Sequence, residues 1–167
     1  MAQTKFGDTT VNTAGNLPPV GTLAGDFILT GQDMKDVSLS KFRGKNIVLN
    51  IFPSVDTRVC ATSVREFNKR ASELNNTAVV CISKDLPFAF KRFCAAEGIE
   101  NVTSLSDYKG NGFGKNYGVE LIDGPYQGLF ARAVIVIDSH GKVRYTELVP
   151  VIGDEPDYDK ALAALGN

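Results

Sequence analysis

Three short and almost uninterrupted apolar runs constrain the fold of this 167-residue chain more than any other feature. The runs are NIVLNIF at 46–52, TAVVCIS at 77–83 and RAVIVID at 132–138. Runs of this length are typical of β-strands that are covered on both faces of a sheet. Because helical patterns lie between and after these runs, the sequence predicts an α/β sandwich around a central mixed β-sheet.

The helical patterns have recognisable faces and ends. Residues 61–74 have one apolar helical face, which consists of Val64, Phe67, Ala71 and Leu74. Asn75-Asn76 should end this helix. A second helix is predicted within residues 85–98, with Asp85 as its candidate N-cap and Gly98 as its end. The segment DYDKALAAL at 157–165 indicates a last helix.

Further strand patterns complete the sheet. Residues 27–45 alternate as a hairpin and its connection do, and NVTSLSD at 101–107 indicates another strand. KVRYTELV at 142–149 follows the turn SHG and should run antiparallel to the strand at 132–138. No repeat, linker or low-complexity segment interrupts the chain, so we expect residues 1–167 to form one domain.

The composition narrows the classes of function. A formal net charge of -1 gives no general attraction to nucleic acid or to anionic membranes. The chain has no apolar run of about 18 residues, as a membrane span needs, and its N-terminus lacks the apolar region of a secretory signal. Three cysteines are too few for a disulfide-stapled secreted scaffold. We therefore expect a protein of a reducing compartment.

The cysteines are the main candidates for chemistry. Cys60, Cys81 and Cys94 form no CxxC motif, which excludes a thioredoxin-type dithiol, and a zinc site would need more ligands. The single histidine, His140, lies in DSHGK, which indicates a turn between two strands. A Cys–His dyad is conceivable, although a lone histidine in a turn is usually solvated and idle. No GxSxG motif supports a Ser-His-Asp site.

Cys60 lies where the strand at 46–52 gives way to a helix. Pro53 fixes its own φ and favours an extended Phe52, which ends the strand. A helix start has partial positive charge and unpaired N–H groups, and such a site favours the thiolate form of a cysteine. The hydroxyl of Thr57 could turn toward the sulfur or cap the helix. From position alone, a buried structural thiol is an equally good interpretation of Cys60.

The pattern Pro53-x-x-x-Thr57-x-x-Cys60 after an apolar strand resembles the active-site signature of peroxiredoxins. The longer run NIFPSVDTRVCATSVREFN resembles that of the thiol peroxidase subgroup, the atypical two-cysteine peroxiredoxins of bacteria. The resemblance extends over nearly the whole chain. It includes GDFIL, VSLSKFRGK, CISKDLPFAFKRFCAAEG, GPYQGLFARAVIVID and EPDYDKALAAL.

This resemblance implies a thioredoxin-like fold of the peroxiredoxin type, with an N-terminal β-hairpin extension. It implies that Cys60 is the peroxidatic cysteine, which passes through a sulfenic acid, and that Cys94 is the resolving cysteine. It also implies that Arg132 directs its guanidinium at the peroxidatic sulfur. Thr57 would hydrogen-bond the sulfur and the peroxide, and Pro53 would shield the pocket.

The implied activity is the reduction of hydrogen peroxide and organic (alkyl) hydroperoxides through a Cys60–Cys94 disulfide. Thioredoxin would be the reductant, and the protein would be a homodimer packed near the active-site face. It would serve antioxidant defence and redox homeostasis in a bacterial cytoplasm, without cofactor, metal, nucleic acid or membrane. A redox sensor that relays oxidation to another protein is the alternative, and a silent thioredoxin-fold scaffold is a third hypothesis that the intact motif disfavours.

Several features leave the interpretation open. Arg58 departs from the small residue that is familiar at this position of the subgroup, and it could add positive potential or contact a partner. Cys81, within an apolar strand, is interpreted as an inert buried thiol, with a back-up resolving role as the alternative. Four phenylalanines could form an apolar entrance or belong to the core: Phe88, Phe90, Phe93 and Phe130.

Cys60 and Cys94 lie on separate predicted helices, with a strand between them in the sequence. A disulfide requires Cα atoms about 4.4–6.8 Å apart. We therefore expect the first turn around Cys60, the helix around Cys94, or both to loosen before the disulfide closes.

Overall fold

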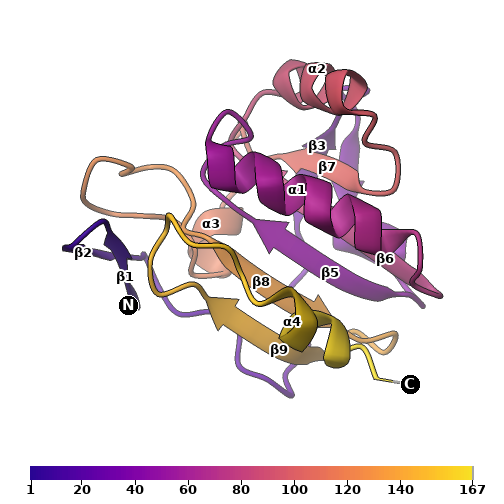
Figure 1. The fold of residues 1–167 in the computed structure, drawn as a ribbon. Helices are drawn as coiled ribbons and strands as arrows, with labels where there is room; N and C mark the ends of the chain where they lie inside the picture. Colours follow the sequence, from indigo (N-terminus) through magenta and orange to yellow (C-terminus); the bar gives the residue numbers. More distant parts are fainter. Residues whose placement is uncertain (167) are drawn as a thin grey trace.

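The computed structural model describes residues 1–166 and is built around a seven-stranded mixed sheet (Figure 1). Its strand order is β4-β3-β7-β6-β5-β8-β9. The strands are β1 (Gln3–Phe6), β2 (Thr9–Asn12), β3 (Ile28–Gly31), β4 (Asp36–Ser38), β5 (Asn46–Ile51), β6 (Thr77–Ser83), β7 (Thr103–Ser106), β8 (Ala133–Ile137) and β9 (Val143–Leu148). Strands β5, β6 and β7 are parallel neighbours, whereas β8 is antiparallel to both β5 and β9. The predicted mixed sheet is confirmed.

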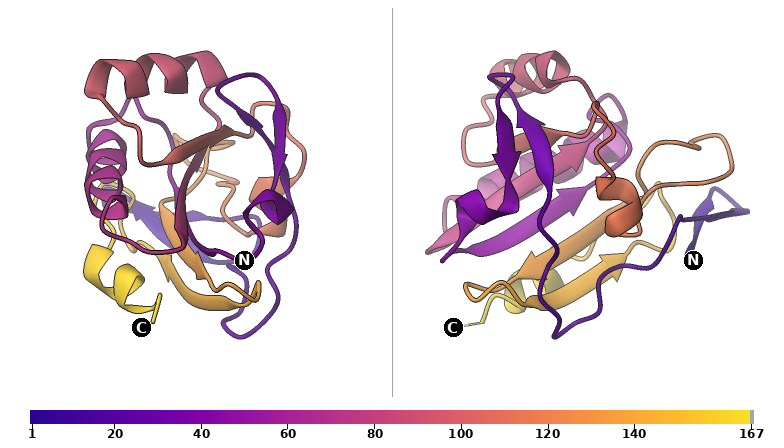
Figure 2. Two further views of the ribbon diagram at one scale, coloured as in Figure 1. Left: turned by 90° about the vertical axis from the view of Figure 1, so that its right-hand side faces the viewer. Right: turned by 180° about the vertical axis from the view of Figure 1, so that it is seen from behind.

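Helices cover both faces of this sheet, which explains the continuous apolar runs. They are η1 (Leu39–Phe42), α1 (Arg58–Ala71), α2 (Pro87–Glu97), α3 (Phe113–Asn116) and α4 (Tyr158–Ala163). In the left view of Figure 2, α1 and α4 lie on one face of the sheet, and α3 and η1 lie on the other. Successive β5 residues alternate accordingly, because Val48 packs with Phe67 of α1 whereas Leu49 packs in the cluster that contains Phe113 of α3.

The N-terminal hairpin of β1 and β2 forms a separate two-stranded sheet, as the family resemblance implies. It is attached to the segment that follows β9. The Thr4 hydroxyl donates to the Val149 carbonyl at 2.8 Å, and the Ile152 N–H donates to the Lys5 carbonyl at 2.9 Å. These bonds hold β1 on the same side of the molecule as the start of α1 (Figure 1), and Phe6, the last residue of β1, lines one cavity together with Arg58.

Helix boundaries differ from the prediction. Helix α1 begins at Arg58, three residues before the predicted helical segment 61–74. The first helix ends at Ala71 rather than near Leu74, because the chain tightens there and Leu74 N–H bonds to the Ala71 carbonyl three residues back. Asp85 is not the N-cap of α2. That position is Leu86, with a proline as the first helical residue, while Gly98 ends α2 in the left-handed conformation as predicted.

Within residues 1–166, no helix is both long and apolar enough to cross a membrane.

Candidate active site

Cys60 is the third residue of α1 and so lies in the first helical turn, whereas the sequence predicts a position in or just before that turn. Thr57 is the N-cap residue of α1 and has an extended backbone, with φ −101° and ψ 147°. Its hydroxyl donates to the Ser54 carbonyl at 2.9 Å, and it makes no cap bond to the helix. Within residues 1–166, no hydrogen bond joins the Thr57 hydroxyl to the Cys60 sulfur. The hydroxyl bonds instead to the Ser54 carbonyl, a partner that the sequence did not suggest.

The sulfur of Cys60 contacts a buried guanidinium. Arg132 lies one residue before β8, is 2% exposed, and donates from Nη2 to Cys60 Sγ at 3.2 Å. Its Nε donates to the Ile152 carbonyl at 2.8 Å, which fixes the plane of the side chain. Its Nη1 has no hydrogen-bond partner within residues 1–166. A buried cation with an unused donor favours an anionic group beside it.

A cavity of about 410 Å³ lies beside this pair. It is lined by Phe6, Gly7, Pro53, Thr57, Arg58, Val59, Tyr126, Arg132, Ile152 and Gly153. The rings of Phe6 and Tyr126 meet edge to face, with centroids 4.7 Å apart, and give the cavity an aromatic wall. Cys60 itself is 0% exposed. In this conformation a ligand in the cavity would therefore contact the Arg132 guanidinium and not the sulfur.

The aromatic wall was not identified from the sequence. Of the four phenylalanines that could form an apolar entrance, three belong to the core, namely Phe90, Phe93 and Phe130. Phe88 is 63% exposed and does not line the cavity. Phe6 and Tyr126 take this role instead, from the N-terminal hairpin and from the loop before β8. Neither segment has a local sequence pattern that links it to Cys60, because only the fold brings Phe6 and Tyr126 together beside the cysteine.

All three cysteines are free thiols. Cys94 lies on α2, is 6% exposed, and packs in the same apolar cluster as Cys60 and Phe90. Its Sγ lies 3.6 Å from Ser104 Oγ. Cys81 is fully buried on β6, and this burial raises the pKa of its thiol to about 12. Cys81 is therefore held as a neutral thiol, which supports its interpretation as inert.

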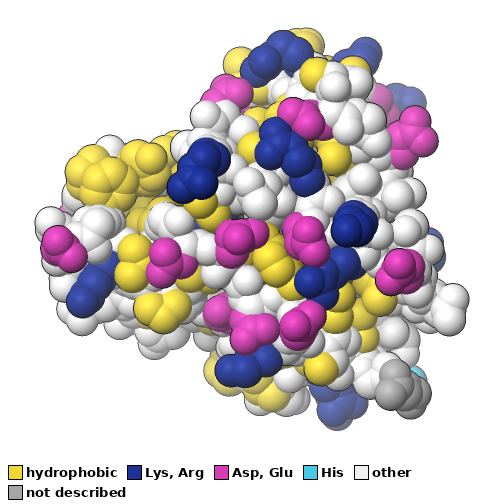
Figure 3. Space-filling model, in the orientation of Figure 1, with side chains coloured by type: hydrophobic (Ala, Val, Ile, Leu, Met, Phe, Trp, Pro, Cys, Tyr) yellow, Lys and Arg dark blue, Asp and Glu magenta, His cyan; other side chains and the backbone are white. Residues whose placement is uncertain are grey.

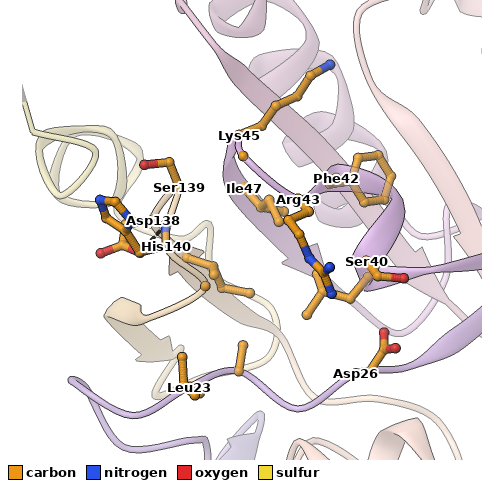
Figure 4. Close-up of a pocket in the computed structure, with 15 residues that line it drawn as sticks. Leu23, Asp26, Ser40, Phe42, Arg43, Lys45, Ile47, Asp138, Ser139 and His140 are labelled. Carbon is orange, nitrogen blue, oxygen red and sulfur yellow. Dashed lines mark hydrogen bonds between the residues drawn. The ribbon is translucent and has the colours of Figure 1, made fainter.

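His140 does not belong to this site. It lies in the turn between β8 and β9, where its N–H donates to Asp138 Oδ1 at 2.9 Å. Figure 4 shows it at another cavity, of about 440 Å³, whose opposite side includes Arg43 and Ser40. That cavity is at the beginning of β5 and the end of β8, whereas Cys60 follows the end of β5. The Cys–His dyad is therefore wrong, and cavity size alone does not identify the reactive site.

The surface around α1 and α4 has interspersed charges of both signs, and no face of one sign dominates this view (Figure 3). Within residues 1–166, no cluster of three or more His, Cys, Asp or Glu side chains could hold a metal ion.

Known proteins resemble this chain both in sequence and in fold. The family model described as Redoxin matches residues 18–162. The chain is 57% identical over 166 residues to a thiol peroxidase of Mycobacterium tuberculosis, and 56% identical over 165 residues to one of Corynebacterium glutamicum, with 99% of each chain covered. A solved peroxiredoxin-like protein of Aquifex aeolicus is 34% identical, with a TM-score of 0.93 over 99% of this chain and 96% of that one. A thiol peroxidase structure from Chromobacterium violaceum has the same fold, with a TM-score of 0.90 at 24% identity over 99% and 96% of the two chains.

Proposed function

The chain belongs to the redoxin family and, within it, to the thiol peroxidases, and from this membership we propose a residue-level catalytic cycle for it. The coarse activity follows from the family: the protein is a peroxiredoxin-type oxidoreductase that reduces peroxides with thiols. We propose which residues act in this reduction, which peroxides are the substrates and which protein is the reductant. The observation that supports it most is the buried Arg132, with one N–H on the Cys60 sulfur and one N–H unused.

In the first step the Cys60 thiolate attacks one peroxide oxygen. An S–O bond forms, the O–O bond breaks, and the leaving alkoxide or hydroxide takes a proton to become an alcohol or water, which leaves Cys60 as a sulfenic acid. The unused Nη1 of Arg132 can donate to the oxygen on which negative charge develops. Thr57 donates its proton to Ser54, so its remaining lone pairs can accept a hydrogen bond from the peroxide and orient it. Pro53 forms part of the cavity wall and limits access of water.

In the second step the Cys94 thiol condenses with the sulfenic acid, which forms the Cys60–Cys94 disulfide and releases water. Cys60 lies on α1 and Cys94 on α2, and both thiols are buried, so we expect the first turn of α1 or part of α2 to loosen in this step. Thioredoxin then reduces the disulfide. The aromatic wall of Phe6 and Tyr126 suits organic hydroperoxides with apolar groups, and hydrogen peroxide is small enough to enter the same cavity.

We further propose that residues 1–167 act as one domain and that the protein is a homodimer of the bacterial cytoplasm. The free cysteines fit a reducing compartment, and the curated relatives are bacterial. Leu86 and Phe88 are 51% and 63% exposed at the start of α2, which follows Asp85 and its bond to the loop before Cys60, and both would be covered in a dimer packed on this face. Sedimentation of the Phe88→Asp variant tests this, since a dimer through this face should dissociate into monomers.

The cycle is tested by peroxide-dependent oxidation of reduced thioredoxin. The Cys60→Ser variant should be inactive. The Cys94→Ser variant should undergo one fast sulfenylation and then stop turning over through the internal disulfide. The Cys81→Ser variant is the matched control, because it replaces a buried thiol that the cycle does not use. Wild-type protein that consumes one equivalent of peroxide and stops would instead indicate a redox sensor.

A further inference from the structure

One carboxylate that the proposed cycle does not use joins the loop that follows β5 to the end of the neighbouring parallel strand β6. Asp85 lies two residues beyond the end of β6. Its Oδ1 accepts a hydrogen bond from Ser54 Oγ at 2.7 Å, and its Oδ2 accepts one from the Val55 N–H at 2.9 Å. The Ser83 hydroxyl also donates to Oδ2, and the Ser106 hydroxyl donates to the backbone carbonyl of Asp85. The three bonds to the carboxylate are charge-assisted, and such bonds are stronger than those between neutral groups.

These bonds continue from Asp85 to the start of α1. The Ser54 carbonyl accepts bonds from both the N–H and the hydroxyl of Thr57, at 3.2 and 2.9 Å. The Ser54 hydroxyl accepts the Asp56 N–H at 3.1 Å while it donates to Asp85. Thr57 in turn accepts the Ala61 N–H at 3.0 Å, in the same helical turn as the peroxidatic cysteine. The conformation of the loop at 53–57 therefore depends on a side chain from another part of the chain.

The same residue adjoins the other redox segment. Leu86, the N-cap of α2, follows Asp85 directly, and α2 contains Cys94. One side chain thus fixes the loop before Cys60 to the entrance of the helix that contains Cys94. Any separation of these two segments breaks the bonds to Ser54 and Val55.

We propose that Asp85 is a positioning residue that holds the loop at 53–57 in the conformation that reacts with peroxide. Its bonds to Ser54 and Val55 oppose the loosening that closure of the Cys60–Cys94 disulfide needs. This inference rests on the proposed peroxidase cycle. Because displacement of a reacting group by about 1 Å can cost about 100-fold in rate, loss of the carboxylate should slow the peroxide step and not the closure step.

The test measures the two steps separately in the variants Asp85→Ala and Ser54→Ala. Reduced protein is mixed with cumene hydroperoxide, quenched with a thiol-blocking reagent, and analysed by mass spectrometry for sulfenic acid and disulfide. We expect at least a 10-fold slower oxidation of Cys60 in both variants, with disulfide closure unchanged or faster. The double variant should be no slower than Asp85→Ala alone, because both changes remove the same contact.

A matched control is Asp138→Ala, in the turn between β8 and β9. The Asp138 carboxylate also accepts three bonds, from the N–H groups of His140 and Lys142 and from Arg144 Nε, at 2.9, 3.0 and 2.6 Å. Its loss should reduce stability without slowing Cys60 oxidation. Should Asp85→Ala fail to fold, Ser54→Ala decides the matter, since it removes a single hydroxyl.

Peroxide oxidation within threefold of wild type in folded Asp85→Ala or Ser54→Ala overturns the proposal, as does an equal slowing of both steps. Amide hydrogen exchange over residues 54–60 gives a readout that does not depend on activity. These amides should exchange at least 10-fold faster in Asp85→Ala than in wild type or Asp138→Ala. An inactive wild type would refute the proposed function, whereas unchanged exchange would refute the role of Asp85 alone.

Discussion

Replacement of Arg132 by methionine separates two effects that a cation can have on the Cys60 sulfur. The arginine is 2% exposed, gives Nη2 to the sulfur at 3.2 Å and keeps Nη1 without a partner within residues 1–166. Methionine fills a similar space but donates no hydrogen bond. The variant therefore loses both the charge that favours a thiolate and the donor available to the peroxide oxygens.

The two losses differ in size. An ordinary cysteine thiol, with a pKa of about 8.5, is about 3% ionised at neutral pH, so the thiolate fraction can account for at most about a 30-fold change in rate. Part of even this gain is offset, because a less basic thiolate is a weaker nucleophile. Removal of one donor aimed at developing negative charge typically costs about 100- to 1000-fold. We therefore expect Arg132→Met to slow the peroxide reaction by more than about 1000-fold.

Iodoacetamide provides the reference reaction, because its alkylation rate reports the thiolate while its iodide leaving group needs no hydrogen-bond donor. The rates of Cys60 with cumene hydroperoxide and with iodoacetamide are measured in wild type and variant. The peroxide rate should fall about 100-fold further than the alkylation rate. Equal factors for both reagents would refute the assigned role of the guanidinium. Arg144→Met is the control, because Arg144 is exposed and paired with Asp138.

Three further predictions concern single side chains. Because burial raises the pKa of Cys81 from 9.0 to about 12, its contribution to stability is complete below pH 9 and is lost as the pH rises toward 12. Between pH 8 and 11, urea titration should show that wild type loses about 3 kcal/mol more than Cys81→Ala. Phe6→Ala should lower kcat/KM for cumene hydroperoxide about 10-fold and that for hydrogen peroxide less than threefold, because only the bulky substrate contacts the aromatic wall. Arg58 is exposed on the cavity wall and forms no ion pair within residues 1–166, so its charge is free to attract a carboxylate. Arg58→Gln should therefore reduce kcat/KM for a fatty-acid hydroperoxide about 3- to 10-fold and leave kcat/KM for the methyl ester of that hydroperoxide unchanged. Arg43→Gln, which also removes an exposed arginine, is the control.

The central strands could be predicted because burial on both faces leaves a direct signal in the sequence. The run at 77–83 coincides with β6, and the run at 46–52 exceeds β5 by one residue. The N-terminal hairpin came only from the family resemblance, since its strands are short and mostly exposed on one face. Its position depends on bonds to residues 149–152, more than 140 residues away, which no local pattern encodes.

The chemistry of the site was partly encoded in one loop. The position of Cys60 in the first helical turn follows from Pro53 and the start of the apolar helix face. No pattern in the sequence itself points to Arg132, and only the resemblance implies that it faces the sulfur. The structure adds what spacing could not supply, namely that Nε is fixed by the Ile152 carbonyl and that Nη1 is left over.

Asp85 shows how a correct local rule can assign the wrong partner. An aspartate just before an apolar helix is a good N-cap candidate, and this argument uses residues 85–98 alone. The sheet supplies a competing set of donors, because β5 and β6 are parallel neighbours and their carboxyl ends meet at one edge. Ser54 and Val55 follow β5 at this edge, and Ser83 ends β6. The two serine hydroxyls and the Val55 N–H all donate hydrogen bonds to the Asp85 carboxylate. Polar residues just beyond the ends of adjacent parallel strands should therefore be considered as partners of one another before they are assigned to the next helix.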